Sequence, residues 1–180
     1  MKLRKGSQDA TGLTFGIVAS KFNKFVAGRL LTECVKALTK AGVTDEAIEV
    51  VRVPGAFEIP LVARQLARSG RFDAVICLGA VIRGDTPHFE YISAEVSRGI
   101  LQASMDSNIP VIFGVLTTDT VAQAIERADP DKLNRGADAA KTAIEMVNVM
   151  RLLKKEGSGE TPQPAAPSRR AGRSAARPKR

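Results

Sequence analysis

The run Asp73-Ala-Val-Ile-Cys-Leu-Gly-Ala-Val-Ile82 is almost wholly apolar, and it decides the fold class. A strand with one wet face would alternate apolar and polar residues, whereas a continuous apolar run is typical of a strand buried on both faces. Such strands belong to parallel sheets that carry helices on both sides. We therefore expect helices and further strands to alternate on either side of this run.

The rest of the chain fits that expectation. Apolar residues recur at helical spacing in the segments between the apolar runs, and Gly42 and Gly70 are expected to end the first two helices. This order predicts an α/β protein, a three-layer α/β/α sandwich around a four-stranded, mainly parallel, flavodoxin-like sheet with right-handed crossovers. The predicted strands are 13–19, 47–53, 73–82 and 110–116, and the predicted helices are 23–41, 58–69, 87–107, 120–127 and 136–156.

The chain of 180 residues is long enough for one domain with a buried core, which we assign to residues 13–156. Residues 1–12 contain no apolar core and are predicted to be a flexible segment. Residues 157–180 hold four prolines, six basic residues, one acidic residue and no large apolar residue, so they are predicted to be a disordered basic tail. The tail could contact nucleic acid or an acidic surface. A solvated extension without a partner is favoured, because no aromatic residue is interleaved for base stacking.

Several classes of protein are excluded or disfavoured. The longest uncharged apolar run, residues 74–82, is far shorter than the roughly 20 residues of a membrane helix. Residues 1–12 do not form a secretory signal, so a cytoplasmic location is predicted. Cys34 and Cys77 lie in apolar segments and are expected to be buried and unbridged. One histidine and two separated cysteines make a zinc site improbable, the two common glycine-rich nucleotide fingerprints are absent, and neither metal nor cofactor is expected.

The site is expected at one edge of the sheet, because ligands of such folds bind beyond the carboxyl ends of the strands. That rule selects the loops at 20–23, 53–60, 83–88 and 117–119. These loops are rich in glycine, proline, aromatic and polar residues, and they contain His88, the single histidine of the chain.

The stretch Gly84-Asp-Thr-Pro-His88 suggests an anion site beside a base. Thr86 suits a helix N-cap and Pro87 suits the first helical position. The free N–H groups of such a helix start can hold a phosphate. The dipole disfavours a protonated imidazole, so His88 is expected to accept a proton. The alternative is a plain cap with a surface histidine.

Four further residues are candidates, and the first three have two interpretations each. Glu58, at a helix start, could accept hydrogen bonds from a polyhydroxyl ligand or could simply favour the helix dipole. Phe22, in a polar loop, could stack on a planar ring or could cover the core. Arg127 could bind an anion or could stabilise a helix C-terminus. Phe113 lies inside a strand, where core packing is the default.

Five stretches together resemble the lumazine synthase family, and they keep the family's order and spacing over residues 12–153. The resemblance implies a transferase that condenses 5-amino-6-(D-ribitylamino)uracil with 3,4-dihydroxy-2-butanone 4-phosphate. The products would be 6,7-dimethyl-8-ribityllumazine, phosphate and water, in the penultimate step of riboflavin biosynthesis. No cofactor is implied. The stretches are Phe22-Asn23, Val53-Pro-Gly-Ala-Phe-Glu-Ile-Pro60, Gly79-Ala-Val-Ile-Arg-Gly-Asp-Thr-Pro-His-Phe-Glu-Tyr91, Gly114-Val-Leu-Thr-Thr118 and Asn134-Arg-Gly136.

The resemblance also implies a role for each matching residue. His88 would be the proton acceptor, and Phe22 would stack on the pyrimidine. The ribityl chain would contact Ala56, Phe57 and Glu58, and the pyrimidine would contact the backbone of Ala80, Val81 and Ile82. The phosphate would contact Asp85 and Thr86. The neighbouring subunit would supply Phe113 and Arg127, with Arg127 pairing with the phosphate and Arg135 assisting there.

Shared sites imply a homo-oligomer, either a pentamer or a sixty-subunit shell of pentamers. The family's Gly-Thr-Lys-Ala-Gly-Asn-like stretch, which bears on shell closure, is here Asp129-Pro-Asp-Lys-Leu-Asn134. Three alternatives remain: a related enzyme with another carbonyl substrate, a lumazine- or flavin-binding or shell-forming protein without turnover, and a nucleic-acid binder that uses the tail.

Overall fold

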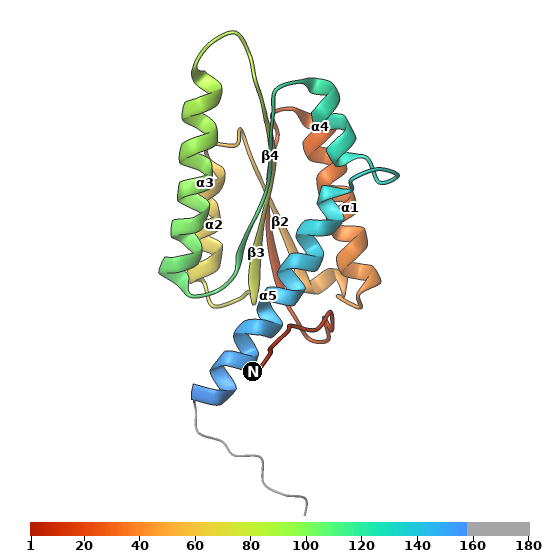
Figure 1. Cartoon of the computed structure of the whole chain (residues 1–180), viewed down its shortest axis with the longest axis vertical. Helices are drawn as coiled ribbons and strands as arrows, with labels where there is room; N and C mark the ends of the chain where they lie inside the picture. The colour runs from red at the N-terminus through yellow and green to blue at the C-terminus, as the bar shows by residue number, and fades with distance from the viewer. Residues whose placement is uncertain (158–180) are drawn as a thin grey trace, which may run out of the picture.

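The computed structural model describes residues 1–157, the side chains of 155–157 excepted. Figure 1 shows one sheet with helices on both sides, which confirms the predicted three-layer α/β/α sandwich. Every predicted strand and helix is present. In chain order the elements are β1 (Phe15–Ser20), α1 (Lys24–Lys40), the short 3₁₀ helix η1 (Asp45–Ala47), β2 (Ile48–Val53), α2 (Ile59–Arg68), β3 (Ala74–Ile82), α3 (His88–Ser107), β4 (Val111–Thr118), α4 (Val121–Ala128) and α5 (Arg135–Gly157).

The four strands are arranged in the order β2-β1-β3-β4, and all of their pairings are parallel. β1 and β3 therefore lie at the centre of the sheet, and both are buried along almost their whole length. β2 and β4 lie at the edges, where buried and accessible positions are mixed. The continuous apolar pattern of residues 74–82 is thus the pattern of a central strand.

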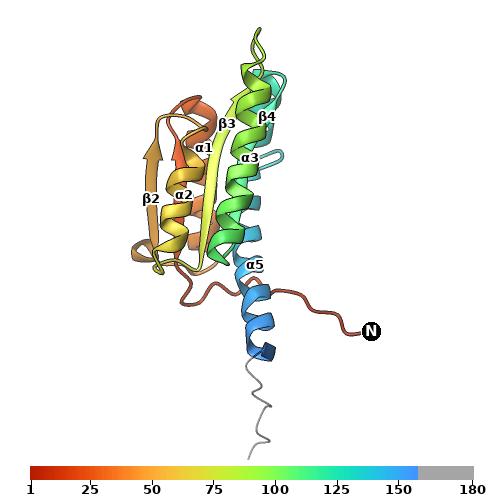
Figure 2. The same ribbon diagram turned by 90° about the vertical axis from the view of Figure 1, so that its left-hand side faces the viewer.

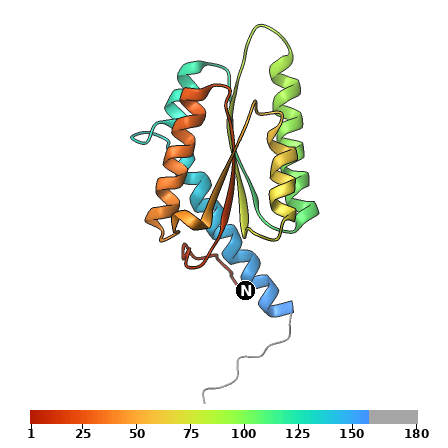
Figure 3. The same cartoon turned by 180° about the vertical axis from the view of Figure 1, so that it is seen from behind.

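The sheet separates two hydrophobic layers. Figures 1 and 3 show α2 and α3 on one face, and α1, α4 and α5 on the other. Successive side chains of a strand point to opposite faces. Ile17 and Ile76 accordingly belong to the cluster under α1 and α5, while Val18 and Cys77 belong to the cluster under α2 and α3.

Both predicted glycine stops are confirmed. Gly42, immediately after the C-cap of α1, has φ +95°, and its N–H donates to the carbonyl of Thr39 at 3.0 Å. Gly70 follows α2 with φ +72°. A residue with a Cβ adopts such φ values only at a steric cost, so each helix ends where the sequence supplies a glycine.

Two predicted boundaries need correction. α3 begins at His88 with Pro87 as its N-cap, and no side chain caps it, so Thr86 is not the N-cap. Pro87 has ψ 6°, outside the helical range, which delays the helix by one residue. β4 extends to Thr118, because Thr117 and Thr118 pair with the end of the long strand β3 instead of forming a loop.

The two ends of the described chain lie at the pole away from the carboxyl ends of the strands (Figure 2). Residues 1–12 form no helix or strand, but Asn148 of α5 donates to the carbonyls of Ser7 at 3.1 Å and Asp9 at 2.8 Å, and Ala10 is buried. Flexibility of this segment stays a prediction. α5 ends at Gly157, and the predicted tail beyond it lies outside the described residues.

Cys34 and Cys77 are both buried and both free, as predicted. Burial raises the pKa of the Cys34 thiol to about 12 and raises the pKa of Cys77 as well, so both are protonated, apolar core residues. None of the helices among residues 1–157 has the length and apolar character needed to cross a membrane.

Candidate functional site

A cavity of about 650 Å³ lies at the carboxyl edge of the sheet, where the loops after β1, β2 and β3 meet. Parallel strands end at the same edge, so residues far apart in the sequence converge there. The cavity walls are mostly apolar or aromatic, with a few polar groups, as in small-molecule sites generally. Its lining residues are Phe22, Asn23, Pro54, Gly55, Ala56, Phe57, Glu58, Ala80, Val81, Ile82, Gly84, Thr86, His88, Phe89 and Ile92.

Most of the residues predicted from the sequence line this cavity. His88 and Thr86 come from the loop after β3 and the start of α3, and Asp85 lies between two lining residues of the same loop. The others enter from the ends of β1, β2 and β3, namely Phe22, Ala56, Phe57, Glu58, Ala80, Val81 and Ile82.

The loop after β1 is fastened to the loop after β2 by backbone hydrogen bonds. The N–H of Lys21 donates to the carbonyl of Val53 at 2.7 Å, and the N–H of Phe22 donates to that of Pro54 at 3.0 Å. Phe22 is 69% exposed and lines the cavity, so its aromatic side chain is accessible to a planar ligand.

Glu58 is the N-cap residue of α2. Its Oε2 accepts a hydrogen bond from the N–H of Gly55 at 2.9 Å, which closes the 55–58 turn and directs the carboxylate to the cavity rim. A carboxylate can accept about four hydrogen bonds. Glu58 therefore keeps capacity for the hydroxyl groups of a ligand.

His88 is the first residue of α3, the helix start whose first N–H groups have no partner within the helix. Its side chain is exposed and lines the cavity. This arrangement can transfer a proton beside a bound anion, which the helix N-terminus attracts.

Arg83, just before that loop, is held between two carboxylates. Its Nε donates to Asp119 at 2.8 Å, its Nη1 donates to Glu90, and its guanidinium lies 4.2 Å from the ring centroid of Phe89. The hydrogen bonds to Asp119 and Glu90 raise the pKa of Arg83, and the same pairing lowers the pKa of Glu90. The cation is thus neutralised locally, and it braces the two ends of the 84–88 loop.

The remaining predicted residues lie elsewhere in the chain. Phe113, Arg127 and Arg135 line a second cavity of about 560 Å³ along the edge strand β4 and α5. Phe113 is 47% exposed, although core packing is the default for a strand residue. Arg127 donates to the carbonyl of Gln123 at 3.1 Å, and Arg135 pairs with Asp138 at 3.1 Å. Within one chain, the predicted residues thus form two groups: those at the first cavity, with His88, and those at the second cavity, with Arg127.

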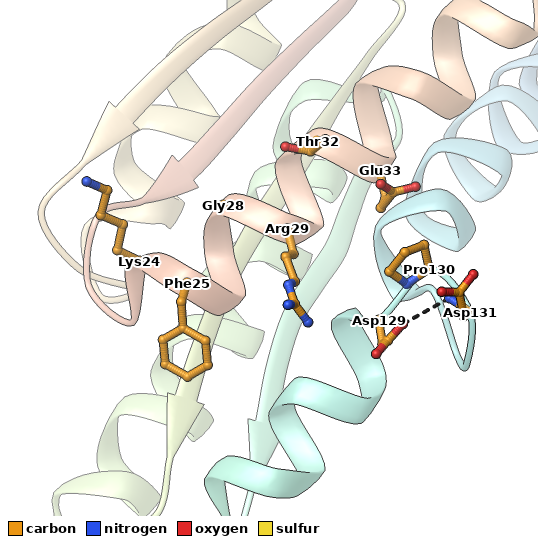
Figure 4. Close-up of a pocket in the computed structure, with 9 residues that line it drawn as sticks. All are labelled: Lys24, Phe25, Gly28, Arg29, Thr32, Glu33, Asp129, Pro130 and Asp131. Atoms are coloured by element: carbon orange, nitrogen blue, oxygen red, sulfur yellow. Dashed lines mark hydrogen bonds between the residues drawn. The ribbon is translucent and has the colours of Figure 1, made fainter.

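A third cavity, of about 780 Å³, lies between the start of α1 and the 129–131 turn (Figure 4). It contains none of the predicted site residues. Arg29 points from α1 toward the turn, where Asp129 accepts a hydrogen bond from the backbone N–H of Asp131 at 3.0 Å. The turn belongs to the 129–134 stretch that the sequence analysis singled out. Among residues 1–157, no group of three or more His, Cys, Asp or Glu side chains is arranged as metal ligands would be.

From the sequence, no role was assigned to four of the lining residues: Asn23, Pro54, Phe89 and Ile92. Asn23 is the most informative of them. Its backbone is left-handed, with φ 52°, and its Nδ2 donates to the carbonyl of Ala80 at 2.9 Å. The sequence pattern placed Asn23 at the start of the predicted helix 23–41, and nothing local in the sequence indicated a contact 57 residues away.

Comparison with known proteins agrees with this geometry. The model of the family described as 6,7-dimethyl-8-ribityllumazine synthase matches residues 12–151. A protein of Syntrophus aciditrophicus (strain SB) named 6,7-dimethyl-8-ribityllumazine synthase is 60% identical over 149 residues, which cover 83% of this chain and 97% of that relative.

The fold, the site and these matches define a transferase of riboflavin biosynthesis that acts on small-molecule substrates. The chain belongs to the 6,7-dimethyl-8-ribityllumazine synthase family.

Proposed function

We propose that the protein condenses 5-amino-6-(D-ribitylamino)uracil with 3,4-dihydroxy-2-butanone 4-phosphate to give 6,7-dimethyl-8-ribityllumazine, phosphate and water. One observation carries this proposal: a single cavity gathers an exposed aromatic ring, a carboxylate, open strand ends, and a histidine at a helix start. These are the groups that a flat pyrimidine with a polyhydroxyl chain and a phosphorylated partner require.

Each group has a step to perform. Phe22 stacks on the pyrimidine, Glu58 accepts hydrogen bonds from the ribityl hydroxyls, and the strand segment 80–82 contacts the ring edge. The 85–86 loop holds the phosphate. His88 accepts a proton during amine addition, loss of phosphate or ring closure. Holding two substrates together supplies an effective molarity of about 10⁵ M or more, so positioning accounts for much of the rate.

The phosphate leaves as an anion, so a fixed cation near it lowers the barrier. Within one chain, Arg127, Arg135 and Phe113 line a different cavity from His88. We propose that an adjacent subunit supplies them, Arg127 pairing with the phosphate and Phe113 covering the pyrimidine pocket. The assembly that the family resemblance implies is a pentamer, alone or within a sixty-subunit shell. A cytoplasmic location remains an expectation.

The test mixes purified protein with both substrates and follows lumazine formation by absorbance, with the uncatalysed reaction subtracted. His88→Ala is assayed in parallel, and circular dichroism checks its fold. We expect clear turnover by the wild type and a loss of about 10²-fold or more in the variant. Equal turnover by both proteins would remove His88 from the mechanism. No wild-type rate above background would instead indicate a ligand-binding or shell-forming protein.

A further inference from the structure

We propose that Asn23 is a positioning residue, which fixes Phe22 relative to the β3 segment 80–82 through its side-chain hydrogen bond to Ala80. The inference rests on the proposed function, because it concerns the two walls between which the pyrimidine would lie. Neither the sequence pattern nor the family resemblance assigned a role to this residue.

The backbone of Asn23 is the first part of the argument. Its φ of 52° and ψ of 46° are left-handed, a conformation that asparagine adopts more readily than most non-glycine residues. Its carbonyl accepts hydrogen bonds from the N–H groups of Val26 and Ala27, both at 3.0 Å, so α1 starts there. A cap asparagine usually accepts a hydrogen bond from the helix with its side chain. Here no side-chain cap bond forms.

The amide of Asn23 instead crosses to the neighbouring strand. Its Nδ2 donates to the carbonyl of Ala80 at 2.9 Å. β1 pairs with β3 only as far as Leu78, so this bond continues the connection past the last strand pair. Ala80 is 3% exposed, and a buried carbonyl that lacks a partner is unfavourable. The Asn23 side chain thus satisfies a group that forms the cavity wall.

Phe22 depends on this bond because few other contacts hold its loop; within the loop, the Ser20 hydroxyl donates to the carbonyl of Phe22 at 3.4 Å. Phe22 is 69% exposed and belongs to neither hydrophobic core cluster. The backbone bond from Phe22 to Pro54 connects the loop to β2, and the Asn23 side chain connects it to β3. The loop that carries Phe22 is therefore attached at two places, at Pro54 after β2 and at Ala80 of β3. Without the second attachment, the loop keeps its attachment to β2 but can move away from residues 80–82.

The chain offers a matched control. Asn108, the C-cap of α3, is also left-handed, with φ 55°, and lies just before β4 at the opposite edge of the sheet. Replacement of either asparagine by glycine keeps a left-handed backbone without strain. Asn23→Gly removes the bond to Ala80, whereas Asn108→Gly makes the same chemical change far from the cavity.

The kinetic test compares both variants with the wild type. We expect Asn23→Gly to raise the KM for the pyrimidine substrate about tenfold, the factor expected for one lost hydrogen bond, with kcat changed by less than about twofold. Asn108→Gly should leave both constants unchanged. Asn23→Asp, which keeps the size and backbone preference but cannot donate, should repeat the increase in KM even if the glycine variant folds poorly. An unchanged KM in Asn23→Gly and Asn23→Asp would overturn the inference.

A second readout needs no turnover. Hydrogen–deuterium exchange over residues 20–24 and 79–84 should become faster in Asn23→Gly and stay as in the wild type in Asn108→Gly. If exchange becomes faster in an Asn23 variant but the wild type forms no lumazine, the role of the Asn23–Ala80 hydrogen bond is supported and the proposed function is rejected. Unchanged exchange in both segments would reject the role of this hydrogen bond, whatever the activity.

Discussion

Arg83 illustrates how single side chains shape the loop that carries His88. Its side chain donates hydrogen bonds to Glu90 of α3 and to Asp119, which follows β4. The 84–88 loop connects Arg83 to the start of α3, so the bond to Glu90 joins the two ends of this loop. All three side chains are substantially exposed, so the network orients the loop more than it stabilises the fold.

Removal of this cation should be visible in the titration of Glu90. The hydrogen bond from Arg83 lowers the pKa of Glu90, so this contribution to stability is present above the ordinary carboxyl range and is lost as the pH falls through the lowered value. Arg83→Met should return the pKa of Glu90 upward toward its ordinary value, as measured by carboxyl-carbon NMR. Arg98→Met, which removes an exposed cation elsewhere on the same helix, should leave Glu90 unchanged. An unchanged pKa of Glu90 in Arg83→Met would contradict the hydrogen bond assigned between Arg83 and Glu90.

Arg127 provides the second prediction for a single residue. If it binds the phosphate, Arg127→Gln should raise the KM for the phosphorylated substrate about tenfold or more and should alter the pyrimidine KM little. Steady-state kinetics with each substrate varied in turn measures both constants. An equal loss of affinity for both substrates would indicate a damaged subunit interface instead.

The sequence predicted most of the site because one rule applied residue by residue. Glycine, aromatic and polar residues after apolar strands had to lie at the same edge of a parallel sheet. Phe113, Arg127 and Arg135 were outside that rule; Arg127 was noted as a possible anion ligand, and only the resemblance gave Phe113 and Arg135 a role at the site. Asn23 was missed because its side chain contacts a residue that is close in space and distant in the chain.

At the scale of elements, apolar runs and helical periods predicted every strand and α-helix but not the short 3₁₀ helix η1, and the element boundaries depended on tertiary contacts. Thr117 and Thr118 look like loop residues, but the long strand β3 offers them pairing partners. α3 starts late because of the backbone conformation at Pro87. Neither effect is encoded in local periodicity.

The packing of α5 on α1 depends on Gly136. A Cβ at this position would lie 2.4 Å from the carbonyl oxygen and 3.0 Å from the Cα of Leu30, which are backbone atoms that cannot turn aside. Gly136→Ala should therefore lower the free energy of unfolding by about 1–3 kcal/mol, as overpacking does. The midpoint of urea unfolding at fixed protein concentration measures the change.

Gly28 is the matched control, because it lies within α1 and a Cβ there meets nothing within 4 Å. Gly28→Ala should stabilise the protein by about 0.5–1 kcal/mol, since alanine loses less backbone entropy in a helix than glycine. If Gly136→Ala unfolds at the wild-type midpoint or above it, α5 does not pack as closely as described.

At the scale of the whole molecule, the separation of His88 and Arg127 into different cavities of one chain allows a test of whether two subunits share each site. His88→Ala and Arg127→Ala, co-expressed in equal amounts, should recover activity if each site combines one group from each of two subunits. Random mixing leaves about a quarter of the sites intact. Activity of the purified mixed oligomer measures the recovery.

The control pairs two defects within one cavity. Subunits with His88→Ala and Phe22→Ala, mixed in the same way, should stay as inactive as their parents, because every site then contains one defect. A mixture of the His88 and Arg127 variants no more active than its parents would argue that all groups of a site come from one chain.

The position of the chain ends has a practical consequence. The N-terminus and the end of α5 both lie at the pole away from the cavity edge (Figure 2). A reporter enzyme, fluorophore or antigen fused through a linker to the N-terminus would therefore be carried on the face remote from the cavity mouth. The protein can therefore serve as a display scaffold in which the cavity stays accessible to small molecules.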